Sequence, residues 1–98
     1  MNIEFQAINY VADQELIDFA QKRVEKLAHF FDHIISTQLF TKVEKNDNMM
    51  NKFVELKLVV PGDNMIIKKT AKSFEAAISV AVEAAKIVLK KHKEKIRE

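Results

Sequence analysis

The sequence has very few of the residues on which several common classes of functional site depend. It contains one glycine, Gly62, one proline, Pro61, and no cysteine. Phosphate-binding loops and dinucleotide-binding turns need several glycines because the backbone must approach the phosphate closely, so both classes are excluded. The absence of cysteine excludes disulfide frameworks, thiolate metal sites and cysteine nucleophiles. A reducing compartment is compatible with this composition.

Long apolar runs and a strong net charge are also absent. Residues 1–10 carry polar side chains throughout, so we expect neither a signal peptide nor a membrane span, and a cytoplasmic location. A chain of 98 residues that is 48% hydrophobic and 31% charged can form one core, so we expect a single domain over residues 1–98. The net charge of +2 is too small for a protein that coats nucleic acid indiscriminately.

The spacing of apolar residues predicts the element order β-α-β-β-β-α. Alternation of apolar and polar side chains predicts four strands, over residues 3–7, 35–45, 54–60 and 65–72. Apolar residues at three- and four-residue steps predict two helices, the first capped by Asp13 and ending near Asp32, the second capped by Ser73. The inner stripe of the second helix is expected to be Phe74, Ala77, Ile78, Ala81, Ala85, Val88 and Leu89. A turn is expected at residues 61–64.

This order predicts a two-layer α+β fold in which two helices cover one face of a four-stranded mixed sheet. An RNA-recognition motif is excluded because the helical pattern after Ser73 leaves no residues for a final strand. The last five elements have the order of a double-stranded RNA-binding domain. On the open face of the sheet we expect Phe40, Phe53 and Val59, either as ordinary surface residues or as a patch for a partner.

Basic residues concentrate toward the end of the sequence and along both predicted helices. Residues 86–98 hold six basic and two acidic side chains. One stripe of the second helix is expected to carry Lys86, Lys90, Lys93 and Arg97, and the same spacing on the first helix gives Lys22, Lys26, His29 and His33. Four helical residues rise about 6 Å, which is comparable to the separation of successive phosphates. Each stripe can therefore contact an RNA backbone without reading its bases.

Three other features of the sequence are candidates for a chemical role. Arg23 falls inside the apolar arc of the first helix, where its head either reaches solvent at the rim or binds a phosphate. His29 and His33 have a spacing that can hold a metal, but no third ligand is evident, so neither a metal site nor a cofactor is expected. No serine lies in a sequence motif that would activate it as a nucleophile, and the carboxylates are not paired. We therefore expect neither an enzyme nor a small-molecule substrate.

Several short segments together carry a family resemblance. They are Lys26-Leu27 with Phe31-Asp32, then Lys42–Lys45, Ala76–Ile78 and Lys91–Lys95. In this order and spacing they resemble the short ribosome hibernation promoting factors, also known as ribosome-associated inhibitors or sigma-54 modulation proteins. The resemblance covers nearly the whole chain. It implies a βαβββα domain in the channel between head and body of the small ribosomal subunit, on 16S rRNA where tRNA and mRNA bind, that inhibits translation in stationary phase or stress.

The resemblance also implies specific contacts and partners. It makes Arg23, Lys26, Lys91, Lys93 and Lys95 candidates for contact with rRNA. With the helix stripes, the expected RNA-binding residues are Lys22, Arg23, Lys26, His29, Lys86, Lys90, Lys91, Lys93, Lys95 and Arg97. The expected partners are the small ribosomal subunit and its 16S rRNA, with a second hibernation factor as a further candidate and no membrane. No dimerisation domain like that of long-form members is expected after the basic helix.

Two other functions stay open at this point. One is a generic double-stranded RNA-binding module, which would bind naked duplex RNA as well as it binds ribosomes. The other is a protein-interaction domain that acts through the open face of the sheet.

Overall fold

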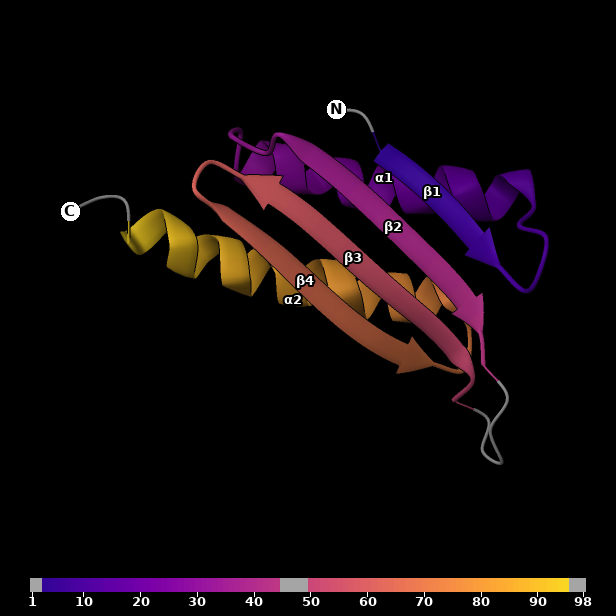
Figure 1. Cartoon of the computed structure of the whole chain (residues 1–98). Coiled ribbons are helices and arrows are strands. Elements are labelled where there is room, and N and C mark those ends of the chain that lie inside the picture. Colours follow the sequence, from indigo (N-terminus) through magenta and orange to yellow (C-terminus); the bar gives the residue numbers. More distant parts are fainter. Residues whose placement is uncertain (1–2, 45–49, 96–98) are drawn as a thin grey trace.

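The computed structural model describes residues 3–44 and 50–95, in which two helices cover one face of a four-stranded sheet (Figure 1). The elements are β1 (Ile3–Ile8), α1 (Gln14–Phe30), β2 (Ser36–Val43), β3 (Lys52–Val60), β4 (Asp63–Ala71) and α2 (Phe74–Lys95). The predicted α+β class and the βαβββα order are confirmed.

The strands lie in the sheet in chain order, β1-β2-β3-β4. β1 pairs with β2 in parallel and places Phe5 beside Leu39, whereas the other two pairs are antiparallel. Parallel neighbours need a crossover, and α1 provides it on the covered face of the sheet. α2 then packs against β3 and β4 and beside α1, so both helices bury their apolar faces on one side.

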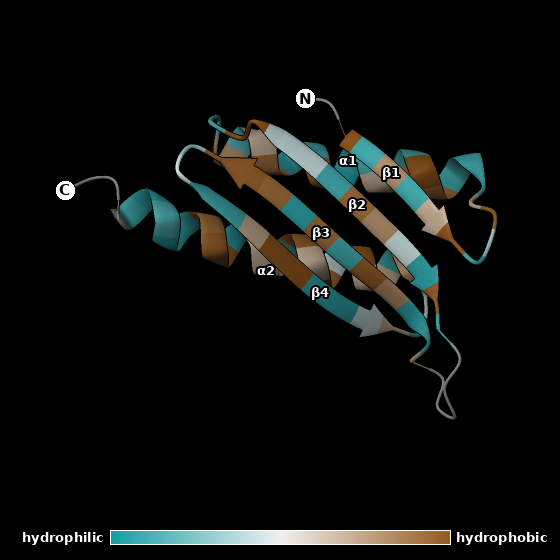
Figure 2. Cartoon of the chain, viewed as in Figure 1, coloured by the Kyte–Doolittle hydropathy of each residue, from teal (hydrophilic) through white to brown (hydrophobic). Residues whose placement is uncertain are grey.

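The core lies between the sheet and the helices because every second strand residue points inward. Along β3 the buried residues are Val54, Leu56, Leu58 and Val60. Hydrophobic and hydrophilic residues alternate over much of β3 in Figure 2. In β4 the apolar residues 65–67 are consecutive, but burial still alternates, with Met65 and Ile67 buried and Ile66 exposed. Each fully buried side chain of this size stabilises the fold by about 1.5–3 kcal/mol.

Local contacts in the structure support the predicted starts of α1 and α2 and the predicted turn between β3 and β4. The Leu16 N–H donates to Asp13 Oδ1 at 2.9 Å, and the Ala76 N–H donates to Ser73 Oγ at 3.1 Å, so both predicted N-caps are confirmed. The turn at residues 61–62 joins β3 to β4, with Gly62 at φ +80°. Glycine suits that left-handed backbone because it has no Cβ.

Several predicted boundaries are wrong by one or two residues. β1 reaches Ile8 rather than residue 7, β2 ends at Val43 rather than residue 45, β3 starts at Lys52 rather than residue 54, and β4 covers residues 63–71 rather than 65–72.

α1 ends at Phe30 rather than near Asp32, because the extended backbone of Phe31 turns its side chain into the core. β2 starts at Ser36, and Ile35 is exposed although its N–H still donates to the Val59 carbonyl at 2.7 Å. The strand expected to reach residue 45 and the polar turn after it fall partly outside the described residues.

One residue of the predicted inner stripe of α2 is also wrong. Val88 is 36% exposed, whereas Val82, which the stripe omitted, is only 3% exposed. The two valines lie on opposite edges of the apolar arc. Val82 is on the edge that faces α1, and Val88 is on the edge that faces β4 and the hairpin turn. A neighbouring helix covers its edge more completely than the border of a sheet does.

The open face of the sheet carries the residues that were expected there. Phe40 lies beside Gln6 and opposite Glu55, and Phe53 lies opposite Lys42. The aromatic side chains are half-buried among these polar neighbours, as is Val59 further along β3. They form no continuous apolar patch, which favours the interpretation as ordinary surface residues.

Candidate nucleic-acid interface

The cations of α1 lie on its solvent side because the other side of the helix is committed to the core. Ala20, Val24 and Leu27 are fully buried, whereas Lys22 and Lys26 are exposed. His29, in the last turn, is exposed as well. The predicted stripe is therefore confirmed as an exposed row over these three residues, and His33 does not continue it because the helix ends at Phe30.

Arg23 reaches the rim of the apolar arc and lies over an aromatic ring. Its guanidinium carbon is 5.1 Å from the centroid of the Phe19 ring, and the side chain is half-buried. A guanidinium over a ring gains an electrostatic attraction to the π-face while its N–H donors stay available. The rim position of Arg23 is thus confirmed, and its role as a phosphate ligand stays a prediction.

The cations of α2 divide between the two flanks of the helix. Lys90 and Lys93 line a hollow together with Phe30 and Glu94, on the flank that faces α1. Lys86 lies on the same flank one turn earlier, where its ammonium contacts Glu83 Oε1 at 3.2 Å. Lys86, Lys90 and Lys93 are therefore brought together with the end of α1.

Lys91 lies on the other flank of α2, apart from Lys90 and Lys93. It lines a second hollow with Asp63, Met65, Val88 and His92, beside the turn between β3 and β4. Lys95 is the last described residue of α2, and Arg97 lies outside the described residues.

Sequence reasoning missed His92, which points inward at this end of the molecule. Its ring meets Phe31 edge to face, with centroids 5.7 Å apart, and its Nδ1 is 4.0 Å from Asp63 Oδ2. The signal was available, because residue 92 continues the buried stripe of Ala85 and Leu89. His92 therefore packs the end of α2 against the core beside the hairpin turn.

The charges of the two helices have a common polarity. In each helix the first half has a net negative charge, with Glu15 and Asp18 in α1 and Glu75 and Glu83 in α2. The second halves are net positive: Lys22, Arg23 and Lys26 outnumber Glu25, and the five lysines of residues 84–95 outnumber Glu94. Cations near a helix C-terminus also interact favourably with the helix dipole.

Because the two helices are parallel, their positively charged C-terminal halves lie at the same end of the helical layer. α1 and α2 lie side by side and run in the same direction, since Phe30 at the end of α1 shares a hollow with Lys90 and Lys93 near the end of α2 (Figure 1). The C-terminal turns of α2 are mostly hydrophilic in Figure 2. We call this region, made of residues 22–30 of α1 and 86–93 of α2, the basic end.

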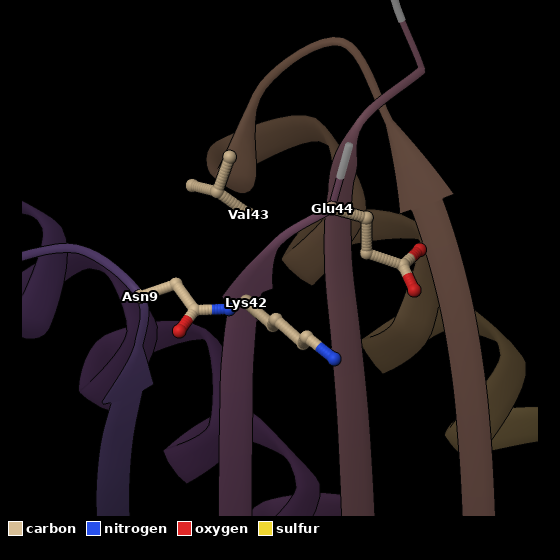
Figure 3. A pocket seen from close by; sticks show the side chains of 4 residues that line it. All are labelled: Asn9, Lys42, Val43 and Glu44. Atoms are coloured by element: carbon tan, nitrogen blue, oxygen red, sulfur yellow. The ribbon is translucent and has the colours of Figure 1, made fainter. Parts of the chain in front are cut away.

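The remaining hollow of note lies at the ends of β1 and β2. Asn9, Lys42, Val43 and Glu44 line it, and in Figure 3 Lys42 and Glu44 extend from positions two residues apart on the same chain segment. Asn9 has φ +67°, a left-handed conformation that asparagine tolerates better than most residues. Among the described residues that line this hollow, the charges of Lys42 and Glu44 cancel, so these residues supply no net positive charge for phosphate binding.

The described part of the chain shows neither a metal site nor a membrane-spanning helix. Within residues 3–44 and 50–95, no three histidine, aspartate or glutamate side chains gather closely enough to hold a metal ion. His33 instead contacts Asp32 at 3.3 Å and the edge of Phe31. Neither α1 nor α2, as described, is long and apolar enough to cross a membrane.

Comparison with known proteins identifies relatives over almost the entire length. Residues 3–97 match the family described as Sigma 54 modulation protein / S30EA ribosomal protein. The protein named ribosome hibernation promoting factor from Pseudomonas putida is 28% identical over 95 residues, which are 97% of this chain and 89% of that protein.

Solved structures share the fold at lower identity. A ribosomal subunit interface protein from Coxiella burnetii superimposes with a TM-score of 0.84 at 15% identity, over 96% of this chain and 99% of that one. The N-terminal domain of Protein Y from Thermus thermophilus gives 0.80 at 18% identity, over 94% and 99%. The resemblance inferred from the sequence is confirmed, and this chain belongs to the Sigma 54 modulation protein / S30EA ribosomal protein family.

Proposed function

We propose that this protein is a ribosome hibernation factor that binds the small ribosomal subunit and inhibits translation in stationary phase or stress. It uses the basic end to hold the phosphates of 16S rRNA in the channel where tRNA and mRNA bind. The family match and the name of the Pseudomonas putida relative support a role at the ribosome. Such a protein works in the cytoplasm, by occupying a site, and needs neither a catalytic step nor a cofactor.

The observation that carries this proposal is the convergence of cations from two helices on one end of the molecule. Lys22, Arg23 and Lys26 come from α1, and Lys90 and Lys93 come from α2, with the helix ends adjacent. A folded RNA presents phosphates at intervals on a curved surface, so two parallel rows of cations can contact more of them than one row can. The charge favours binding by position rather than by base sequence.

The test is co-sedimentation with purified small ribosomal subunits. Replacing Lys90 and Lys93 by glutamine removes two positive charges from the basic end and should weaken binding by at least about tenfold, because each phosphate contact contributes to affinity. The matched control replaces Lys57 and Lys68 by glutamine, which removes the same charge from the open face of the sheet. Thermal unfolding of both variants verifies that each is folded.

Three results would contradict the proposal. They are an absence of binding of the wild-type protein to small subunits at low salt, equal losses in the two double variants, and binding to naked duplex RNA that is as tight as binding to subunits. The last result would instead identify a generic double-stranded RNA-binding module. A wild-type protein that binds subunits must also compete with tRNA for them, since both are proposed to occupy one channel.

A further inference from the structure

The hollow between the ends of α1 and α2 contains a partly exposed aromatic side chain. Phe30 is 37% exposed, while its neighbour Phe31 is 3% exposed and fills the core. The two consecutive phenylalanines thus point in different directions at the point where the helix ends. Lys90, Lys93 and Glu94 complete the lining of the hollow.

The other aromatic residue on this flank of α1 is already occupied. The Phe19 ring is covered by the Arg23 guanidinium at 5.1 Å. Among the residues that the structure describes, no ring and no guanidinium stacks on Phe30. Phe30 therefore presents a free aromatic surface beside two ammonium groups.

This combination matches the chemistry of an unpaired nucleotide. A base stacks on an aromatic ring, and lysines beside the ring neutralise the phosphates on either side of that base. Glu94 repels phosphate but accepts hydrogen bonds from base N–H groups, so its corner of the hollow suits a base edge. Bases in a duplex are stacked on one another and cannot present a face to the ring.

We propose that the hollow binds one unpaired nucleotide of the RNA, with its base stacked on Phe30 and its flanking phosphates at Lys90 and Lys93. This inference rests on the proposed function for the identity of the RNA, and it adds a selection for single-stranded bulges or loops over regular duplex. The basic end then recognises local RNA conformation as well as charge.

A tryptophan at position 30 provides a direct test, because the natural chain contains no tryptophan. The variant Phe30→Trp carries a single indole whose fluorescence a stacked base quenches. Small ribosomal subunits, and an unstructured single-stranded RNA octamer alone, are expected to quench it, whereas a blunt RNA duplex is not. The control is Ile66→Trp, which places the indole on the open face at a residue that is 56% exposed, and which should not be quenched by subunits.

A substitution series at the same position separates stacking from simple apolar contact. Phe30→Tyr keeps the ring and should bind small subunits as the wild type does. Phe30→Leu keeps apolar volume without the ring and should bind about 5- to 150-fold more weakly, the range expected for the loss of one stacked base. A melting temperature equal to that of the wild type verifies that each variant is still folded.

The outcomes distinguish this inference from the proposed function. If the wild-type protein does not bind subunits, the proposed function fails. If the wild type binds but Phe30→Leu binds equally well, or if Phe30→Trp is quenched no more than Ile66→Trp, only the nucleotide site is overturned. Equal quenching by duplex and single strand would also overturn it. Loss of subunit binding in Phe30→Leu without quenching in Phe30→Trp would indicate an apolar contact with a ribosomal protein, and would overturn it as well.

Discussion

Tyr10 joins three elements through a single side chain. Its hydroxyl lies 2.5 Å from Thr41 Oγ1 of β2, and its ring stacks on Phe74 at the start of α2 with centroids 4.5 Å apart. Thr41 donates its own proton to the Gln6 carbonyl at 2.9 Å, so the neutral tyrosine donates to Thr41. The connection between β1 and α1 is held against the rest of the fold at this point.

This environment predicts how Tyr10 titrates. Burial raises the pKa of the Tyr10 phenol above its usual value of 10.0, the Asp13 carboxylate raises it further, and the Thr41 hydroxyl lowers it in part. Tyr10 is the only tyrosine in the sequence, so the ultraviolet absorbance of tyrosinate reports it alone. We expect a titration midpoint above pH 10 in the folded protein and at about 10 in denaturant.

The same pKa shift has a consequence for stability. Because the folded state holds the phenol proton more tightly than the unfolded state does, this contribution is fully present below pH 10 and is lost as the pH rises through the raised pKa. Asp13→Asn keeps a good N-cap residue while removing its charge, and should move the midpoint down. A folded-state midpoint at or below 10 would show that the phenol is not buried as described.

The role of an individual residue can be predicted from the sequence when it depends on one group nearby in the chain. The caps Asp13 and Ser73 act on N–H groups three residues away, and they were predicted correctly. Arg23 stayed ambiguous because its position depends on both Phe19 and the free space beside the helix. His92 was missed although it continues the buried stripe of Ala85 and Leu89. Only its contacts with Phe31 and Asp63, which are distant in sequence, could not be predicted.

The elements themselves were largely predictable because each depends on a local period. Alternation fixed which face of β3 is buried, and the helical period fixed the central stripe of α2. The burial of residues at the edges of this stripe was not predictable, because the helical period alone does not distinguish one edge from the other. Only the arrangement of α2 between α1 and β4 decides that Val82 is covered and Val88 is not.

This difference between the two edges predicts different energetic costs for the same substitution. Val82→Ala removes two buried methyl groups and should destabilise the fold by about 1–3 kcal/mol, whereas Val88→Ala should cost less than about 1 kcal/mol. The two changes have the same chemistry and lie on the same helix, so helix propensity contributes equally to both. Chemical denaturation measures each value, and a larger loss for Val88→Ala would contradict the described packing.

At the scale of the whole molecule, the basic end is built from two helices that are distant in sequence. The sequence indicated two rows of cations, and the structure supplies the parallel direction of α1 and α2 that places both rows at one end. It also separates Lys91 from Lys90 and Lys93, because one residue along a helix turns the side chain by about 100°. The hollow at Phe30 could not be predicted, since it requires both helix ends at once.

The combined charge predicts a strong dependence of subunit binding on salt. If Lys22, Arg23, Lys26, Lys90 and Lys93 each neutralise a phosphate, the logarithm of the binding constant should fall with the logarithm of salt concentration with a slope of about −4. Replacing Lys90 and Lys93 by glutamine should reduce the slope by about 2. Binding measured at several potassium concentrations gives both slopes. A slope near zero in the wild type would mean that phosphate contacts do not drive binding.

The order of elements along the chain determines when the basic end is complete during synthesis of the protein. α2 supplies both the cover of β3 and β4 and half of the basic end. A nascent chain that has emerged only as far as β4 therefore has an uncovered core and has the cations of α1 without the hollow between the two helix ends. If the protein acts as proposed, its RNA-binding surface is therefore complete only when residues 74–95 have been synthesised and folded.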